Sequence, residues 1–94
     1  MTRKFSSKEE ALQMGIFYCR GKVDLKISEL ERVKGQTISQ MDFADLQHKP
    51  AEAEIYALVN SNGQKVMIGV TKDFEEEFWY LWLIDPKSGM ALRV

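Results

Sequence analysis

An unbroken run of seven apolar residues, Phe78 to Ile84, constrains the fold of this chain more than any other feature. Successive side chains of a strand point to opposite faces of the sheet, so the run places apolar side chains on both faces. A strand from a sheet with one solvated face would instead alternate with polar residues. The run therefore predicts a strand that is covered on both sides, although a chain of 94 residues has little mass with which to cover it.

The rest of the C-terminal half also has the pattern of antiparallel strands. After Glu54, Ile55, Ala57 and Val59 alternate with Tyr56 and Leu58 in the two-residue period of a strand, and an apolar segment returns over residues 65–70. Between them, Asn62-Gly63 is typical of a tight hairpin, because both residue types tolerate positive φ. Residues 85–89 form a predicted turn before a short final strand over residues 90–94. We expect an antiparallel β-meander of three to four strands.

The N-terminal segment begins with a helix signal. Ser7 and Glu10 have the spacing of a capping box, and Gly15 is the favoured end of the helix. Residues 16–19 and 22–27 are rich in strand formers, and they would then form a small hairpin. The alternative is a helix that continues through Gly15 as far as Cys19.

Two further short helices are predicted before the meander. A second capping box begins at Ser28, with Gly35 as a stop, and another helix would run from residue 37 or 39 to residue 46. Residues 47–52 are interpreted as a connector, because Pro50 disfavours helical backbone at the residue before it. The predicted fold class is α+β, with short N-terminal helices, and with or without the small hairpin, packed on the C-terminal meander as a single domain over residues 1–94.

Composition and charge narrow the class of protein. An apolar share of 45% and a charged share of 29% are ordinary for a globular domain. The single cysteine, Cys19, cannot form an internal disulfide, and no apolar segment follows the polar N-terminus as a secretory signal would require. The longest apolar run is far shorter than the ~20 residues that span a bilayer. We therefore expect a cytoplasmic protein with no membrane partner.

The residue types that carry chemistry are scarce. His48 is the only histidine, it lies in the predicted connector, and no partner for it is implied by spacing. Cys19 lies in an apolar run, where a small buried hydrophobic residue is the favoured interpretation. One cysteine and one histidine cannot supply the four ligands of a zinc site. The sequence predicts no enzyme activity, no metal site and no cofactor.

The run from Phe78 has two explanations: a central strand covered by the first helix on one face and by a long loop on the other, or a docking surface. The docking surface would take a protein partner or a second copy of the chain, since Trp and Tyr are frequent at binding hot spots. Acidic residues before the run would discourage indiscriminate strand pairing. The candidate binding residues are Tyr56, Glu75, Glu76, Phe78, Trp79, Tyr80 and Trp82. Size and the lack of catalytic residue types are typical of small binding or regulatory proteins such as inhibitors, immunity proteins and phage-encoded regulators.

A nucleic-acid-binding module is the alternative hypothesis. The net charge of −1 argues against it, but basic residues exceed acidic ones over residues 1–34, and aromatic rings lie among them. The candidate residues for this function are Arg3, Lys4, Arg20, Lys22 and Lys26. An RNP1-type motif is absent, because Arg20-Gly21 is not followed by aromatic residues.

Overall fold

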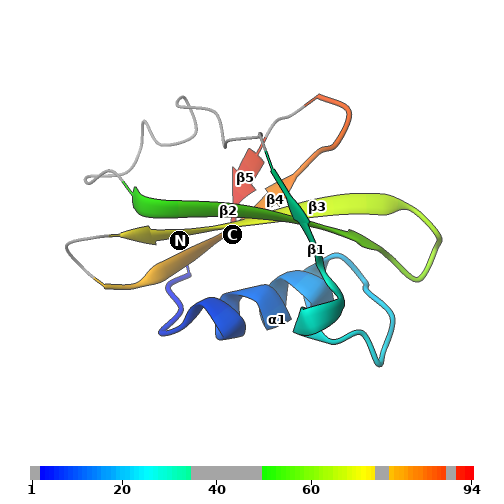
Figure 1. Ribbon diagram of the computed structural model, residues 1–94, viewed down its shortest axis with the longest axis horizontal. Helices are drawn as coiled ribbons and strands as arrows, with labels where there is room; N and C mark the ends of the chain where they lie inside the picture. Colours follow the sequence, from blue (N-terminus) through cyan, green and yellow to red (C-terminus); the bar gives the residue numbers. More distant parts are fainter. Residues whose placement is uncertain (1–2, 35–49, 74–76, 89–90) are drawn as a thin grey trace.

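The computed structural model describes residues 3–34, 50–73, 77–88 and 91–94. The described elements, in chain order, are α1 (Lys8–Tyr18), the 3-10 helix η1 (Ile27–Glu29), β1 (Glu31–Val33), β2 (Pro50–Val59), β3 (Lys65–Asp73), β4 (Trp79–Ile84) and β5 (Ala91–Arg93). The strands form an antiparallel sheet in the order of the sequence, and α1 lies across one face (Figure 1). The predicted α+β class and the meander are confirmed. The described part of the sheet has five strands, more than expected, because β1 pairs with β2.

The start of α1 is as predicted, but its end is not. Ser7 is the N-cap, and its Oγ accepts a hydrogen bond of 3.1 Å from the backbone N–H of Glu10. The helix then continues through Gly15, which lies inside it and against the sheet. A Cβ at this position would be 2.8 Å from Cδ1 of Ile68 and 3.1 Å from Cδ1 of Leu81. Gly15 is therefore a point of close helix–sheet packing and not a helix stop.

The chain leaves α1 through a Schellman motif five residues after Gly15. Arg20 takes the left-handed position with φ 57°, and its N–H donates to the carbonyl of Phe17. The N–H of Gly21 donates to the carbonyl of Ile16, which completes the motif. The hairpin predicted over residues 16–27 is wrong, because residues 16–18 are helical and residues 22–26 form no strand.

The segment after α1 also differs from the predicted capping box at Ser28. Glu29 closes a short 3-10 turn, where its Oε1 accepts a 3.0 Å hydrogen bond from the N–H of Lys26. The chain then enters β1 at Glu31, so no second α-helix forms there. β2 begins at Pro50, within the predicted connector. Gly35 and the helix predicted between residues 37 and 46 lie outside the described residues.

The predicted hairpin between β2 and β3 is confirmed with a wider loop. Val59 pairs with Lys65, so residues 60–64 form the connection. Gly63 has φ 79°, whereas Asn62 has no positive φ. Oδ1 of Asn60 accepts from the N–H groups of Asn62 and Gln64, at 3.0 and 2.9 Å. The Asn60 side chain thus satisfies loop N–H groups that a two-residue turn would not leave free.

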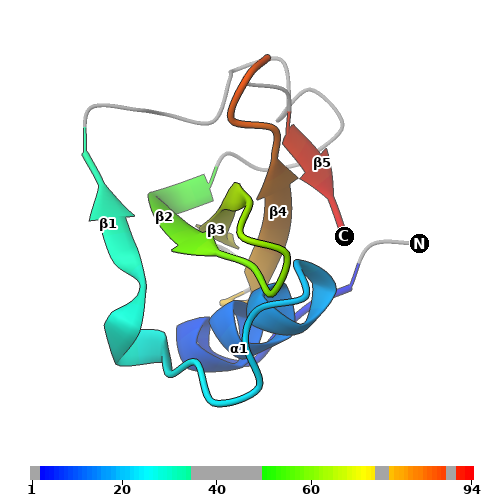
Figure 2. The same cartoon turned by 90° about the vertical axis from the view of Figure 1, so that its right-hand side faces the viewer.

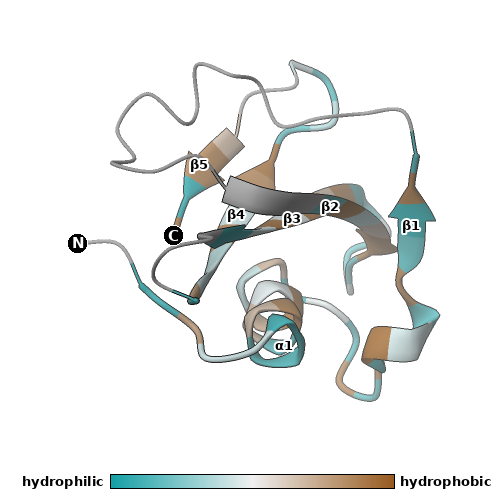
Figure 3. Cartoon of the chain, turned by 60° about the vertical axis from the view of Figure 1, so that its left-hand side comes forward, coloured by the Kyte–Doolittle hydropathy of each residue, from teal (hydrophilic) through white to brown (hydrophobic). Residues whose placement is uncertain are grey.

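Side chains on both faces of β4 are buried, as the apolar run predicted. Leu81 packs with α1 and Ile68 in a helix-side core, while Trp82 and Ile84 belong to a second core on the opposite face. Figure 2 shows β1 and β5 flanking the middle strands, and Val33 and Ala91 from these edge strands pack against the second core. Figure 3 shows α1 beneath the sheet, with polar residues on the side turned away from the strands.

Candidate protein-binding groove

The aromatic residues of β4 lie mainly inside the molecule. Trp82 is 2% exposed and Tyr80 is 6% exposed, and Nε1 of Trp82 donates a 2.9 Å hydrogen bond to Oγ1 of Thr71, which is fully buried. Trp79 is half-buried against the helix-side core. Phe78 is 39% exposed, and Nζ of Lys4 lies 5.5 Å from its ring centroid. Tyr80 and Trp82 therefore do not form part of the surface of the folded chain.

The other predicted binding residues are elsewhere. Tyr56 is half-buried on β2, its hydroxyl donates to Oε2 of Glu54 at 3.3 Å, and Cζ of Arg32 lies 5.6 Å from its ring centroid. Glu75 and Glu76 lie outside the described residues. The structure thus does not bring the predicted set together on one exposed surface of the described residues.

The basic residues of the nucleic-acid hypothesis fall into two groups. Arg3 and Lys4 lie beside β4, where Nη1 of Arg3 donates to the hydroxyl of Tyr18 at 2.6 Å and Lys4 contacts Phe78. Arg20, Lys22 and Lys26 are exposed in the segment between α1 and β1. The aromatic rings near the first group are already in contact with basic side chains of the same chain.

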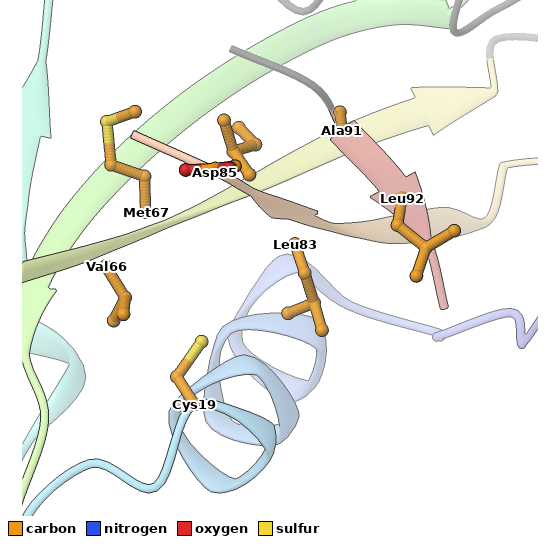
Figure 4. Close-up of a pocket in the computed structure, with 8 residues that line it drawn as sticks. Cys19, Val66, Met67, Leu83, Asp85, Ala91 and Leu92 are labelled. Carbon is orange, nitrogen blue, oxygen red and sulfur yellow. The ribbon is translucent and has the colours of Figure 1, made fainter. Parts of the chain in front are cut away.

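An apolar groove of about 480 Å³ opens where α1 ends beside the sheet (Figure 4). It lies beside the start of β3, the end of β4 and the start of β5, and in Figure 4 the side chain of Cys19 points toward Leu83. We call this feature the β5 groove. Its lining residues are Cys19, Val66, Met67, Leu83, Ile84, Asp85, Ala91 and Leu92.

Leu92 is the most exposed of the large apolar residues in the described strands. Its exposed fraction is 70%, and it lies opposite Leu83 in the β4–β5 pair, so it shares the face of the sheet on which α1 packs. β5 is an edge strand of the described sheet, with β4 as its strand neighbour. A large apolar side chain on an edge strand exposes both a contact surface and an unpaired backbone.

The polar groups of the groove are poor candidates for catalysis. Burial raises the pKa of the Cys19 thiol, which favours the protonated form over the nucleophilic thiolate. The Asp85 carboxylate accepts from the N–H of Lys87 at 2.9 Å and from Oγ of Ser88 at 3.1 Å, and these bonds lower its pKa. Both groups are therefore held in their ordinary charge states at neutral pH, and the groove offers mainly apolar contact.

Charged side chains contact one another on the β1 side of the sheet. Glu54 on β2 contacts Nζ of Lys8 at 3.1 Å and Nη1 of Arg32 at 2.7 Å, which joins α1, β1 and β2. Burial alone would raise the pKa of Glu54, but Lys8, Arg32 and Tyr56 outweigh it and lower the pKa. The hydrogen bond with Glu54 raises the pKa of Lys8. We call Glu54, Lys8 and Arg32 the Glu54 network.

Sequence reasoning did not identify the β5 groove. It correctly described Cys19 as part of an apolar segment, and it treated the final strand only as a closing element. The available signal was Leu92 between Ala91 and Arg93, an apolar residue in a short terminal strand. Recognising the groove also required the correct end of α1, which is Tyr18, whereas the sequence pattern favours an end at Gly15.

The described residues offer no candidate metal site or membrane-spanning helix. Among the described residues, no group of His, Cys, Asp and Glu side chains could hold a metal ion, and His48 lies outside them. No helix in the described parts of the chain has the length and apolar character needed to cross a bilayer. Comparisons with protein families, characterised proteins and solved structures found no significant match.

Proposed function

We propose that this chain is a non-catalytic protein-binding or regulatory module that docks its partner at the β5 groove. The observation that carries the proposal is the 70% exposure of Leu92 beside an almost wholly apolar groove. An exposed apolar side chain at such a site gains free energy when a partner removes it from water, roughly 25 cal/mol for each Å² buried.

The contrast between the two sheet edges supports this proposal. Proteins commonly protect edge strands with charged residues, and β1 carries Glu31 and Arg32 in exposed positions. β5 instead has exposed Leu92 at its centre, and its one charged residue, Arg93, is half-buried with Cζ 5.8 Å from the Tyr80 ring centroid. An edge with less exposed charge is better suited to pairing with another chain.

In this proposal β4 is a structural strand and not the docking surface. Trp82 belongs to the second core and Tyr80 is buried, so we place the docking function not on β4 but on the neighbouring strand β5. The nucleic-acid hypothesis stays a prediction without a structural observation in its favour. Its signature would be an affinity for DNA or RNA that falls steeply with salt.

Co-purification with matched variants tests the proposal. Tagged wild-type chain, Leu92→Glu and Val23→Glu would be recovered in parallel from the native cell, and bound proteins quantified by mass spectrometry. Val23 is the control because it is also an exposed apolar residue, but it lies between α1 and η1 and does not line the groove. We expect partners that are retained by wild type and Val23→Glu and lost from Leu92→Glu. Equal recovery by all three chains would refute the proposal.

A further inference from the structure

Resting on the proposed function, we propose a specific occupant for the β5 groove: an extended segment of another protein, with an apolar side chain flanked by acidic residues. The segment adds to the sheet as a new strand beside β5, and its apolar side chain enters the groove next to Leu92. The argument depends on the backbone of β5, the size of the groove and the charges around it.

The backbone of β5 presents hydrogen-bonding groups to a new strand. The N–H of Val94 donates to the carbonyl of Leu81 at 2.9 Å, so this residue faces β4. Backbone direction alternates along a strand, so Leu92 also faces β4, while the N–H and C=O groups of Ala91 and Arg93 point to the outer edge. No described strand pairs with that edge. An extended segment is the form of partner that satisfies such groups.

The dimensions favour a short segment over a second copy of the chain. A groove of about 480 Å³ is in the size range that accepts a few side chains or a small ligand. β5 has three residues, so strand pairing alone contributes little area. Stable dimers bury roughly 800 Å² on each partner, which is far more than a strand of this length supplies.

The charges around the groove favour an acidic partner. Lys65 directly precedes Val66, and Lys87 follows Asp85 in the turn after β4; both lysines are exposed. Among the described residues, Asp85 is the one acidic side chain lining the groove, and its carboxylate is already bonded within its own turn. Basic residues thus outnumber acidic ones among the described residues that line the groove or lie close to its lining in the sequence, and complementary charges guide the encounter between partners.

Arg20 adds a further cation at the end of α1. It directly follows Cys19 and is exposed, in a left-handed conformation that glycine or asparagine usually occupies. Its carbonyl accepts a hydrogen bond from Ser61, which fixes the backbone at this point. The backbone of Arg20 is therefore held next to Cys19, which lines the groove, and its exposed guanidinium can pair with a carboxylate of the segment in two hydrogen bonds.

Selection from a random peptide library tests the proposal. The folded chain serves as bait, and Leu92→Glu serves for counter-selection. We expect enriched peptides with an apolar residue flanked by Asp or Glu. Replacing the acidic residues of an enriched peptide by Asn or Gln should weaken binding about tenfold, as should Arg20→Gln in the chain, because each change removes a charge-assisted contact.

The outcomes separate this inference from the proposed function. Leu92-dependent peptides that are basic, or that tolerate loss of their acidic residues, would overturn the inference and leave the proposed function standing. A wild-type chain that dimerises in solution while Leu92→Glu stays monomeric would also overturn it, because the occupant would be a second copy. Absence of any Leu92-dependent peptide would refute the inference, and equal co-purification by the matched variants would refute the proposed function.

Discussion

The β1 and β5 sides of the sheet meet the same helix with different chemistry. At the β1 side, Glu54 joins the start of α1 to two strands through Lys8 and Arg32. At the β5 side, the end of α1 and the sheet enclose an apolar groove, and Leu92 is exposed beside it. Charged contacts close the first side, whereas the second keeps apolar surface in contact with solvent. The comparison assigns a structural role to the first side and a binding role to the second.

The largest expected effect separates structural from binding residues near β5, by comparing buried Trp82 with exposed Leu92. Trp82→Ala should lower the free energy of unfolding by about 4 kcal/mol, because it leaves a cavity in the second core and an unpaired Thr71 hydroxyl. Leu92→Ala should change it by less than about 0.5 kcal/mol, as is usual for an exposed side chain. Urea unfolding of both variants measures the difference. Similar losses would mean that Leu92 is structural too.

The packing of α1 provides the next test, since the helix positions its C-cap residue Cys19, which lines the groove. Gly15→Val should cost about 2 kcal/mol, because even its Cβ would lie 2.8 Å from Ile68 Cδ1 in a tightly packed core. Gln13→Val, on an exposed position of the same helix, should cost roughly 0.5 kcal/mol through helix propensity alone. Thermal unfolding compares them. Equal shifts in Tm would show that α1 does not pack closely at Gly15.

The Glu54 network tests the β1 side. Glu54→Gln should lower the free energy of unfolding by about 1 kcal/mol, since the three side chains are partly exposed and solvent screens their attraction. Binding at the β5 groove should not change. A loss of affinity with unchanged stability would contradict the division of roles between the two sides. Glu31→Gln, on an exposed position of β1, is the matched control.

The same network predicts a dependence of stability on pH. The pKa of Glu54 is lower in the folded chain than in the unfolded one, so its contribution is present above the unfolded value, roughly 4.3, and is lost as pH falls through the folded pKa. The pKa of Lys8 is raised, so its contribution is lost only as pH rises through its folded pKa, above roughly 10.4. Denaturation curves from pH 3 to pH 7, for wild type and Glu54→Gln, should converge toward acid. Curves that stay parallel over this pH range would exclude Glu54 as the source of the pH dependence of stability.

The smallest expected effect is a gain in stability at the β5 side. Arg20→Gly should raise the free energy of unfolding by roughly 0.5 kcal/mol, because glycine adopts the left-handed position without strain but loses more entropy on folding. The same change should weaken binding of an acidic segment. Chemical denaturation and an affinity measurement on one preparation check both effects. Loss of stability without loss of affinity would assign Arg20 a structural role.

Local sequence patterns predicted the parts of the fold that depend on local geometry. The Ser7 cap, the β2–β3 hairpin and the two-sided burial of β4 follow from side-chain chemistry within a few residues. The end of α1 could not be predicted in this way. Gly15 has the residue type of a helix stop, and only the nearby Ile68 and Leu81 explain its place inside the helix.

The candidate site was less predictable than the fold. The aromatic run is compatible with a covered central strand and with a docking surface, because a chain of this length has little mass with which to cover both faces of a strand. The two edge strands supply part of the missing cover, since Val33 and Ala91 pack against the second core from either side. The exposed apolar surface therefore lies at Leu92, one strand away from the residues that the sequence indicated.

NMR titration of the labelled chain with an enriched acidic peptide tests most directly whether the β5 side is the binding side. The account predicts that amide shifts concentrate at Cys19, Leu83 and Leu92, and that the amides of Ala91 and Arg93 become protected from hydrogen exchange as the new strand forms. Shifts centred on Arg32 and Tyr56, with β5 amides unchanged, would contradict it.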